Sequence, residues 1–352
     1  MTSQTVKRIQ VRDFATFPEL DLRVAPGLNV IVGENGTGKS QLLKLIYSVL
    51  SVASGPTSLT SDLPRKGTFE GDMANKLVGV LRPESLGRLT TRRPGRSRCE
   101  VRVALGGVSD IAFSFSSNSR TEVRSESLPN TWLEARPVFI PTRELLTIYP
   151  GFVPLYESRA IEFEETWRDT AVLLGAPLTR GPKESRVTEI LRPIEASLGG
   201  VIVEENGRFY LKVPGAGSFE MPLVAEGLRK LGMLARLVAN GSLFADGYLF
   251  WDEPEANLNP KTIRDVARML LILAREGIQV FTATHSLFLL REIEILLATE
   301  FTDQQGGTTF IGLHREGFGA RALQGSTTDD IGDIAALDME LRQTAKYMEV
   351  IE

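Results

Sequence analysis

The chain has 352 residues, with 40 Lys and Arg against 44 Asp and Glu, so its formal net charge is −4. Hydrophobic residues make up 42% and charged residues 24%, an ordinary globular composition that excludes wholesale disorder, collagen-like and coiled-coil architectures. This balance argues against a protein that coats nucleic acid through its overall field, although it is compatible with a local basic patch. The length suits one large elaborated α/β domain, or two domains that share an interface.

The number of cysteines and the sequence of the first residues indicate the cellular compartment in which the protein is expected. Cys99 is the single cysteine, which excludes an intrachain disulfide and a multi-cysteine metal site. Residues 1–5 lack the apolar core of a signal peptide, and no stretch approaches the roughly 20 apolar residues that span a bilayer. We therefore expect a cytoplasmic protein with no membrane attachment.

The first forty residues have the pattern of strands that lead into a loop and a helix. Residues 6–14 and 20–24 alternate apolar and polar side chains, as half-buried strands do. Residues 28–32 form a short apolar run that is typical of a strand in the centre of a sheet. Apolar residues recur at helical spacing from Lys39 onward, which predicts a helix there.

The next part of the chain is less regular. Residues 51–98 are rich in Ser, Gly, Pro and Arg, with helical spacing only at 73–81, and this predicts a flexible, Arg-rich excursion. The elements predicted beyond it are a hairpin within 99–126, a strand at 137–141, helices within 155–198 with a break at 175–181, and a hairpin that turns on Asn206-Gly207.

Strands and helices alternate again in the last third of the chain. The predicted elements are a helix at 222–239, a strand at 248–251, a helix at 261–276, a strand at 278–283 and a helix at 286–299. Alternation at both ends indicates a mainly parallel sheet that is split by a long insertion. We expect a core of residues 1–50 and 220–315, an inserted β and helical subdomain at 51–219, and a C-terminal extension at 316–352.

Residues 33–40, Gly-Glu-Asn-Gly-Thr-Gly-Lys-Ser, fit the phosphate-loop pattern GxxxxGK[ST] at every fixed position. The glycines let the backbone curl until its N–H groups point at phosphate oxygens, and the helix N-terminus adds partial positive charge. In this pattern Lys39 reaches the β- and γ-phosphates and Ser40 holds Mg²⁺. The predicted nucleotide-binding residues are Gly33, Asn35, Gly36, Thr37, Gly38, Lys39, Ser40 and Gln41.

Two later strands end in residues that belong with a phosphate loop. Asp252 and Glu253 end one apolar run, which places Asp252 to bind Mg²⁺ and Glu253 to polarise the attacking water. Read by itself, the acidic pair also fits a solvated turn. His285 follows the next strand and reaches the same edge, where it can contact the γ-phosphate or the water. The other histidine, His314, lies in a turn rich in glycine, and we interpret it as structural.

These three motifs in this order resemble the ABC-type ATPase heads of the soluble SMC-like and OLD-like (AAA_21-type) group. The resemblance covers residues 1–50 and about 220–315. It implies an α/β P-loop NTPase fold, with a mixed central sheet, an antiparallel β subdomain and an inserted helical subdomain. It also implies that Asp252 is the Walker B aspartate, Glu253 the catalytic base and His285 the switch histidine.

Heads of this group also need a signature helix, which covers ATP bound to a second subunit, and a D-loop. Residues 255–258 match the D-loop and residues 223–230 the start of the signature helix. Glu226 and Gly227 are the candidate contacts to nucleotide there. Ala225 stands where a serine hydroxyl would bind the γ-phosphate. An ordinary amphipathic core helix is the alternative interpretation.

A second departure concerns a glutamine that ABC heads carry before the signature helix. No glutamine occurs between Gln41 and Gln279. The best replacement is residues 139–144, Phe-Ile-Pro-Thr-Arg-Glu, where a strand ends in a proline-shaped turn and Glu144 is a candidate metal ligand. A similar Pro-Thr-Arg-Glu sequence occurs in some OLD-like defence ATPases. A capped helix start explains the segment equally well.

Arginines crowd residues 82–102, with few acidic residues among them. They are Arg82, Arg88, Arg92, Arg93, Arg96, Arg98 and Arg102. The functional interpretation is a loop that contacts DNA phosphates. A solvated loop is the alternative, and the absence of interleaved aromatic residues favours it.

The resemblance implies a function built on ATP and Mg²⁺. The chain lacks a Cys-x-x-Cys hook and a long heptad arm, and few residues follow Arg315, so we expect no appended nuclease. The implied protein is an ATP-hydrolysing head that forms a homodimer or higher homo-oligomer around ATP. It would drive a separate nuclease or toxin in DNA maintenance or phage defence. The alternative is a scaffold or sensor that hydrolyses little; Ala225 favours it, whereas Glu253 and His285 favour hydrolysis.

Overall fold

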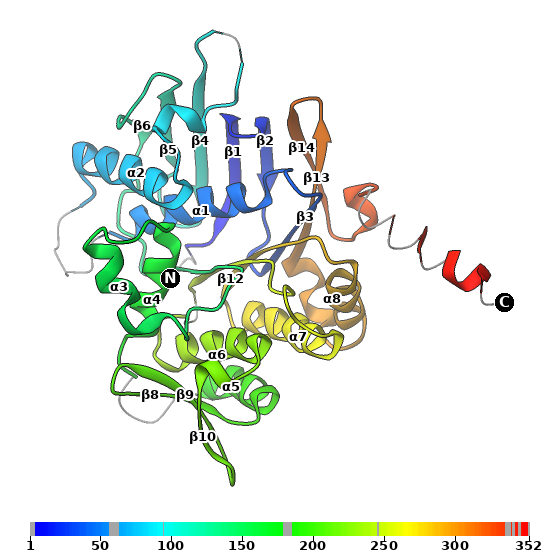
Figure 1. Cartoon of the computed structure of the whole chain (residues 1–352). Helices are drawn as coiled ribbons and strands as arrows, with labels where there is room; N and C mark the ends of the chain where they lie inside the picture. The colour runs from blue at the N-terminus through cyan, green and yellow to red at the C-terminus, as the bar shows by residue number, and fades with distance from the viewer. Residues whose placement is uncertain are drawn as a thin grey trace.

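The computed structural model describes residues 4–55, 63–93, 95–178, 185–244 and 246–334, together with 339, 342–343 and 346–350. Its centre is a six-stranded sheet of order β14-β13-β3-β12-β11-β7, in which every neighbouring pair is parallel except β13 with β14 (Figure 1). The strands are β3 (Leu28–Gly33), β7 (Pro137–Ile140), β11 (Tyr248–Asp252), β12 (Gln279–Thr284), β13 (Thr308–Glu316) and β14 (Gly319–Gly325). Parallel pairing brings the carboxyl ends of β3, β11 and β12 to one edge.

Two antiparallel sheets accompany the central one. The larger has the order β2-β1-β4-β5-β6, and the smaller the order β10-β9-β8. Their strands are β1 (Val6–Phe14), β2 (Phe17–Arg23), β4 (Arg98–Leu105), β5 (Ile111–Ser116), β6 (Arg124–Ser127), β8 (Val201–Glu205), β9 (Arg208–Val213) and β10 (Gly217–Glu220). Asn206 and Gly207, with φ of 53° and 74°, form the predicted tight turn between β8 and β9.

The helices are α1 (Lys39–Ala53), α2 (Lys66–Leu81), α3 (Tyr149–Glu157), α4 (Glu165–Leu174), α5 (Ser185–Leu198), α6 (Glu226–Ala239), α7 (Pro260–Arg275) and α8 (Leu287–Thr299). Local sequence fixes several of their starts. Asn259 caps α7 by accepting a hydrogen bond from the Thr262 N–H at 3.0 Å, and Pro260 occupies the first turn. Ser286 caps α8 in the same way through the Leu289 N–H at 3.2 Å. Among the described residues, none of the helices has the length and apolar character of a membrane span.

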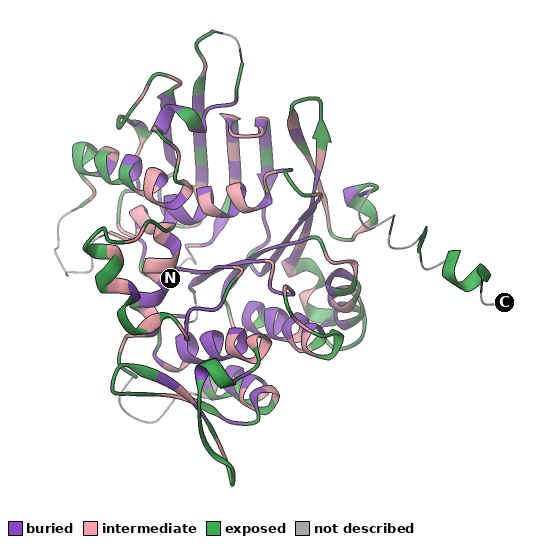
Figure 2. Cartoon of the chain, in the orientation of Figure 1, coloured by how far each residue is buried: buried purple, intermediate pink, exposed green. Residues whose placement is uncertain are grey.

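Two apolar cores lie on opposite faces of the central sheet, because alternate side chains of a strand point to opposite sides. On β11, Leu249 and Trp251 belong to the core formed with α5 to α8, whereas Tyr248 and Phe250 belong to the core formed with α1 and the larger antiparallel sheet. The central strands are accordingly buried along their length in Figure 2. Burial on both faces explains why these strands read as continuous apolar runs.

The α/β fold with a mixed central sheet and an antiparallel β sheet confirms the prediction, but strand pairing crosses the expected domain boundaries. β7 lies within 51–219 and pairs with β11 of the central sheet. β1 pairs with β4, so the antiparallel sheet joins 1–50 to the expected insertion. β14 lies beyond residue 315 and pairs with β13. Cutting the chain at 50, 219 and 315 would therefore divide both large sheets.

The Arg-rich excursion at 51–98 contains more regular structure than expected. Helix α2 begins at Lys66, seven residues before the predicted helical spacing, and buries Phe69, Met73, Leu77 and Val80. Its three glycines weaken the helical signal. Gly79 is required by the fold, because a Cβ there would collide with Glu165 of α4. Residues 56–62 and 94 lie outside the described part of the excursion.

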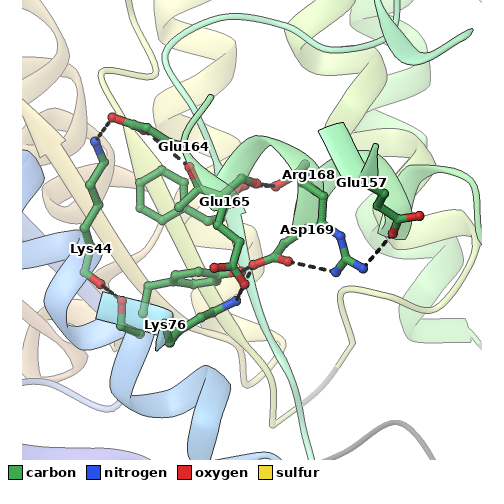
Figure 3. A network of polar contacts seen from close by, with 12 residues as sticks. Lys44, Lys76, Glu157, Glu164, Glu165, Arg168 and Asp169 are labelled. Atoms are coloured by element: carbon green, nitrogen blue, oxygen red, sulfur yellow. Dashed lines mark hydrogen bonds and ion pairs between the residues drawn. The ribbon is translucent and has the colours of Figure 1, made fainter. Parts of the chain in front are cut away.

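A network of part-buried charges joins α1, α2 and α4 (Figure 3). The Lys76 Nζ lies 2.9 Å from Glu165 Oε1 and 2.5 Å from Asp169 Oδ2, and the Tyr47 hydroxyl donates to Asp169 Oδ2 at 2.7 Å. Burial acts to lower the pKa of Lys76, but Asp169 and Glu165 outweigh it and hold that pKa above its ordinary value. Lys44 of α1 pairs with Glu164 at 2.5 Å, immediately before α4. These contacts fix α4 on the helix that follows the phosphate loop.

We expect Lys76→Met to destabilise the protein by about 1–3 kcal/mol, because part-buried Glu165 would lose its cation and Asp169 would keep only Arg168, 3.3 Å away. Urea unfolding followed by circular dichroism measures the change. Lys66→Met on the same helix is the control, since Lys66 is exposed and its Glu70 partner is 3.9 Å away, so it should cost less than about 1 kcal/mol. Equal effects of the two substitutions would contradict a structural role for the network.

Candidate functional site

The loop from β3 into α1 has the conformation that its glycines permit. Gly36 and Gly38 have φ of 83° and 95°, in the left-handed region that other residues avoid. A Cβ at Gly38 would also lie 2.7 Å from the Cζ of Phe17, which is fully buried. Thr37 closes the loop by donating its hydroxyl to the Glu34 carbonyl at 2.8 Å. The predicted phosphate loop is therefore present as a curled backbone segment at a helix N-terminus.

Lys39, the first residue of α1, is buried with 6% of its surface exposed. Its Nζ donates to the carbonyl oxygens of Gly33 at 2.7 Å and Glu34 at 3.0 Å. Burial lowers the pKa of Lys39, and the opposing influences are the carboxylates of Glu253, Asp252, Glu255 and Glu34, in that order. The ammonium group thus faces the acidic residues that follow β11.

Asp252 ends β11 beside Ser40. Burial raises the pKa of Asp252, and a hydrogen bond from Ser40 is the main opposing influence. Its Oδ1 is buried and makes no hydrogen bond with any residue that the structure describes, and the same holds for Gln41 Oε1. An unsatisfied carboxylate oxygen beside a serine hydroxyl is the donor set that Mg²⁺ takes with a nucleotide. Ser40, Gln41 and Asp252 therefore fit the metal and nucleotide roles predicted for them.

Glu253 and His285 lie against each other at the same edge. Glu253 adopts φ of 47°, a conformation uncommon for a residue other than glycine, and its N–H donates to the Ala283 carbonyl at 2.9 Å. This geometry brings Glu253 Oε1 to 3.3 Å from His285 Nδ1. The structure thus brings together Lys39, Glu253 and His285, which are far apart in the sequence.

The start of α6 packs on the D-loop segment, residues 255–258. Glu226 Oε1 accepts a hydrogen bond from Asn257 Nδ2 at 3.1 Å, and Lys230 Nζ donates to the Ala256 carbonyl at 2.7 Å. A Cβ at Gly227 would lie 2.5 Å from Leu258 Cδ2. Glu226 and Gly227 therefore form one surface with the D-loop segment of their own chain.

Glu144 has partners within its own chain. Its Oε1 lies 2.9 Å from Arg229 Nη1 and accepts from the Thr147 hydroxyl at 2.5 Å, while Oε2 accepts from the Thr147 N–H at 3.2 Å. Both oxygens are occupied and the side chain is buried. Glu144 therefore anchors α6 through Arg229, and its role as a metal ligand stays a prediction.

The sequence analysis missed the polar groups of a cavity of about 390 Å³ beside Asp252. Thr142, Lys44 and Glu164 line this cavity together with Asp252. Lys44 also acts to lower the pKa of Asp252. Thr142 belongs to the predicted 139–144 turn and Lys44 lies one helical turn after Ser40, so both had a sequence signal. Glu164 had none, because only the fold brings it to Lys44.

Two other predicted features have structural partners. His314 shares a hydrogen bond with the Ile331 carbonyl at 2.6 Å, in agreement with a structural role. Within the described chain, five arginines of residues 82–102 form ion pairs: Arg82 with Glu162, Arg88 with Glu84, Arg93 with Asp13, Arg98 with Glu126 and Arg102 with Asp110. Their side chains are 41–56% exposed, so these are weak surface pairs.

Comparison with known proteins gives the class. Residues 100–291 match the AAA_21 family, described as "AAA domain, putative AbiEii toxin, Type IV TA system", and the chain belongs to this family. The matched region includes Asp252, Glu253 and His285 and begins after the phosphate loop. An Smc head bound to the C-winged helix domain of ScpA aligns with a TM-score of 0.56 at 13% identity, over 92% of this chain and 98% of that one. The chain thus belongs to the AAA_21 family and has the fold of an Smc head, in agreement with the resemblance in the sequence.

A second Smc head and two RecF proteins are also similar to this chain. An Smc head domain derived from Pyrococcus furiosus, bound to the C-terminal domain of ScpA, aligns with a TM-score of 0.51 at 13% identity, covering 98% of this chain and 99% of that one. DNA replication and repair protein RecF of Paenarthrobacter aurescens is 33% identical over 73 residues, which are 21% of this chain and 18% of RecF. RecF of Edwardsiella ictaluri is 48% identical over 42 residues, or 12% of each protein. The chain thus spans less than a fifth of these RecF proteins.

We expect Gly38→Ala to abolish nucleotide binding and to destabilise the protein by about 1–3 kcal/mol, because alanine at this φ is strained and its Cβ would strike Phe17. Isothermal calorimetry with ATP and urea unfolding measure the two effects. Gly71→Ala on α2 is the control: its Cβ would meet no atom within 4 Å, and a helix gains about 0.5–1 kcal/mol from the change. Normal nucleotide affinity in Gly38→Ala would contradict the site.

Proposed function

We propose that this chain is an ATP-binding and ATP-hydrolysing head that closes as a homodimer around ATP and acts on a separate effector. The observation that carries the proposal is the convergence of Lys39, Asp252, Glu253 and His285 at one edge of the central sheet. ABC-type heads as a class use ATP with Mg²⁺, and the residues present fit both groups.

Nucleotide binding would use the phosphate-loop N–H groups, Lys39, Ser40 and Asp252. Lys39 donates to two neutral carbonyl oxygens, and phosphate oxygens are stronger acceptors for an ammonium group. Ser40 and the unsatisfied Asp252 Oδ1 would hold Mg²⁺. The metal ion, when bound, neutralises charge on the phosphate oxygens.

Glu253 is the proposed general base. Its carboxylate would accept a proton from the attacking water, and the contact of its Oε1 with His285 Nδ1 at 3.3 Å holds it in one orientation. The strained backbone at Glu253 supports this role, because such conformations gather where the fold over-determines a functional residue. His285 is 46% exposed and so has a face available to a ligand.

Dimerisation would use the surface formed by α6 and the D-loop segment. Glu226, Gly227 and Asn257 lie together there, with a helix N-terminus that favours anions. Covering the nucleotide of a partner subunit with this surface would tie association to the presence of ATP. The departure at Ala225 leaves the helix N-terminus and the Gly227 N–H to replace the serine.

The proposed setting is prokaryotic DNA maintenance or phage defence, with a nuclease or toxin as the effector. The family description names a toxin of a type IV system, and the RecF relatives are named for replication and repair. Both similar Smc heads are bound to ScpA domains, which supports a partner protein for this head. The alternative, a scaffold or sensor that hydrolyses little, is favoured by Ala225 and by the absence of a glutamine between Gln41 and Gln279.

We expect Glu253→Gln to trap an ATP-bound dimer, because binding is retained while proton transfer to residue 253 is lost. Light scattering with and without Mg·ATP measures the mass, and phosphate release measures turnover, which should fall at least about 100-fold. Lys39→Ala is the control and should stay monomeric with ATP. A monomeric Glu253→Gln protein that still binds ATP would count against the dimer, and equal phosphate release by wild type and variant would favour the sensor.

A DNA-binding role for residues 82–102 is a subordinate part of the proposal. If these arginines neutralise DNA phosphates, replacing Arg92, Arg93, Arg96 and Arg98 with alanine should weaken duplex binding. It should also flatten the slope of log K against log[salt] by about 0.9 for each phosphate that the variant no longer neutralises. Fluorescence anisotropy over a salt series measures this slope. An unchanged slope would support the alternative interpretation, a solvated loop with arginines in intramolecular ion pairs.

A further inference from the structure

The D-loop segment contains a carboxylate that the proposed mechanism does not use. Glu255 is 7% exposed and lies three residues after Asp252. Its Oε1 accepts a hydrogen bond from the Thr284 hydroxyl at 2.5 Å and another from the His285 N–H at 3.4 Å. The same oxygen lies 3.9 Å from His285 Nδ1. One buried acid therefore contacts the main chain, the neighbouring side chain and the ring of the switch histidine.

These contacts continue into the helix that follows His285. The Thr284 hydroxyl accepts a hydrogen bond from the Ser286 N–H at 3.0 Å, and Ser286 in turn caps α8 through Leu289. Glu255 thus holds the turn between β12 and α8 at its first two residues. Burying a carboxylate is costly unless it is hydrogen-bonded, and burial indeed raises the pKa of Glu255 against the opposing Thr284 hydrogen bond. The hydrogen bonds from the Thr284 hydroxyl and the His285 N–H offset part of that cost.

Two carboxylates lie beside one nitrogen of the His285 ring, Glu253 nearer than Glu255. Glu253 Oε1 lies 3.3 Å and Glu255 Oε1 3.9 Å from Nδ1. The second oxygen of Glu255, Oε2, is buried and makes no hydrogen bond with the described residues, so Glu255 has acceptor capacity to spare. An acceptor at Nδ1 selects the tautomer with hydrogen on Nδ1 and leaves Nε2 as the nitrogen available to a ligand.

We propose that Glu255 is a positioning residue that fixes the backbone and the Nδ1–H tautomer of His285. This inference rests on the proposed function only for its kinetic consequence. When Glu253 turns to the attacking water, Glu255 keeps Nδ1–H paired, so the ring holds its orientation. Glu253 acts on the water directly, whereas Glu255 acts through His285.

The tautomer can be measured without nucleotide, because the chain has two histidines only. Long-range ¹H–¹⁵N spectra of the full-length protein, labelled on histidine, distinguish the two neutral tautomers, and His314→Gln assigns the signals. Glu253 Oε1 is the nearer acceptor at Nδ1, so the spectra are recorded in a Glu253→Ala background, which reproduces a Glu253 turned away from the ring. We expect His285 to keep hydrogen on Nδ1 in Glu253→Ala and in Glu253→Ala/Glu255→Gln, because the glutamine carbonyl oxygen can still accept from the Thr284 hydroxyl and stand beside the ring. Glu253→Ala/Glu255→Ala should shift His285 toward the Nε2–H form.

Glu144→Ala is the matched control, since Glu144 is also buried and also accepts from a threonine hydroxyl, but it contacts Arg229 rather than His285. It should leave the His285 signals unchanged. Thermal unfolding of each variant confirms that the spectra come from folded protein. In the Glu253→Ala background, an unchanged tautomer after Glu255→Ala, or a Glu255→Gln protein that behaves like Glu255→Ala, would overturn the proposal.

Kinetics supply the second readout. Glu255→Ala should lower kcat for ATP by about 10–100-fold, the usual effect of removing a group that orients a functional histidine, with KM changed less than about twofold. Glu255→Gln should recover most of kcat. A rise in KM with kcat intact would contradict the positioning role. If wild-type protein releases no phosphate, the proposed hydrolysis fails, while the tautomer experiment still decides the inference about Glu255.

Discussion

The site depends on one buried ammonium group facing three carboxylates across the edge of a parallel sheet. Lys39 is held on one side by carbonyl oxygens of its own loop and on the other by the field of Asp252, Glu253 and Glu255. Each of these charges would be costly to bury by itself. Their joint presence requires β3 and β11 to end level with each other, which the parallel register through β12 provides. Fold and electrostatics therefore specify the same arrangement.

Helix α1 connects the edge of the central sheet to α4 through polar side chains along one of its faces. Ser40 contacts Asp252, Lys44 pairs with Glu164 one turn later, and Tyr47 reaches Asp169 on α4 in the following turn. These side chains follow one another at the spacing of a helix face, so a single rigid element joins the phosphate loop to α4. Lys44 also acts to lower the pKa of Asp252, and Lys44, Glu164 and Asp252 line the same cavity. The network in Figure 3 continues this connection to α2.

The sequence predicted the parts of the molecule whose pattern is local. A phosphate loop, two apolar strands ending in polar residues, and an Asn-Gly hairpin each carry their signal within a few residues. The missed features depend on contacts between distant segments. Glu164 gains its partner 120 positions away, and Glu144 gains Arg229 of α6. Helix α2 was obscured by glycines, one of which the packing of Glu165 demands. The pairing of β7 and β14 also depends on distant segments, since both strands complete a sheet that continues across the expected boundaries at 219 and 315.

The contacts of the D-loop segment argue that closure and hydrolysis are coupled in the proposed head. Lys230 of α6 is fully buried and donates to the Ala256 carbonyl, and Asn257 donates to Glu226. Glu255, the residue before Ala256, holds Thr284 and His285. In the proposed dimer, these contacts would carry a displacement of α6 to residues 255–258 and to the turn that presents His285 to Glu253. An ordinary core helix has no need of a buried lysine on that carbonyl, so the Lys230 contact favours a functional signature helix despite Ala225.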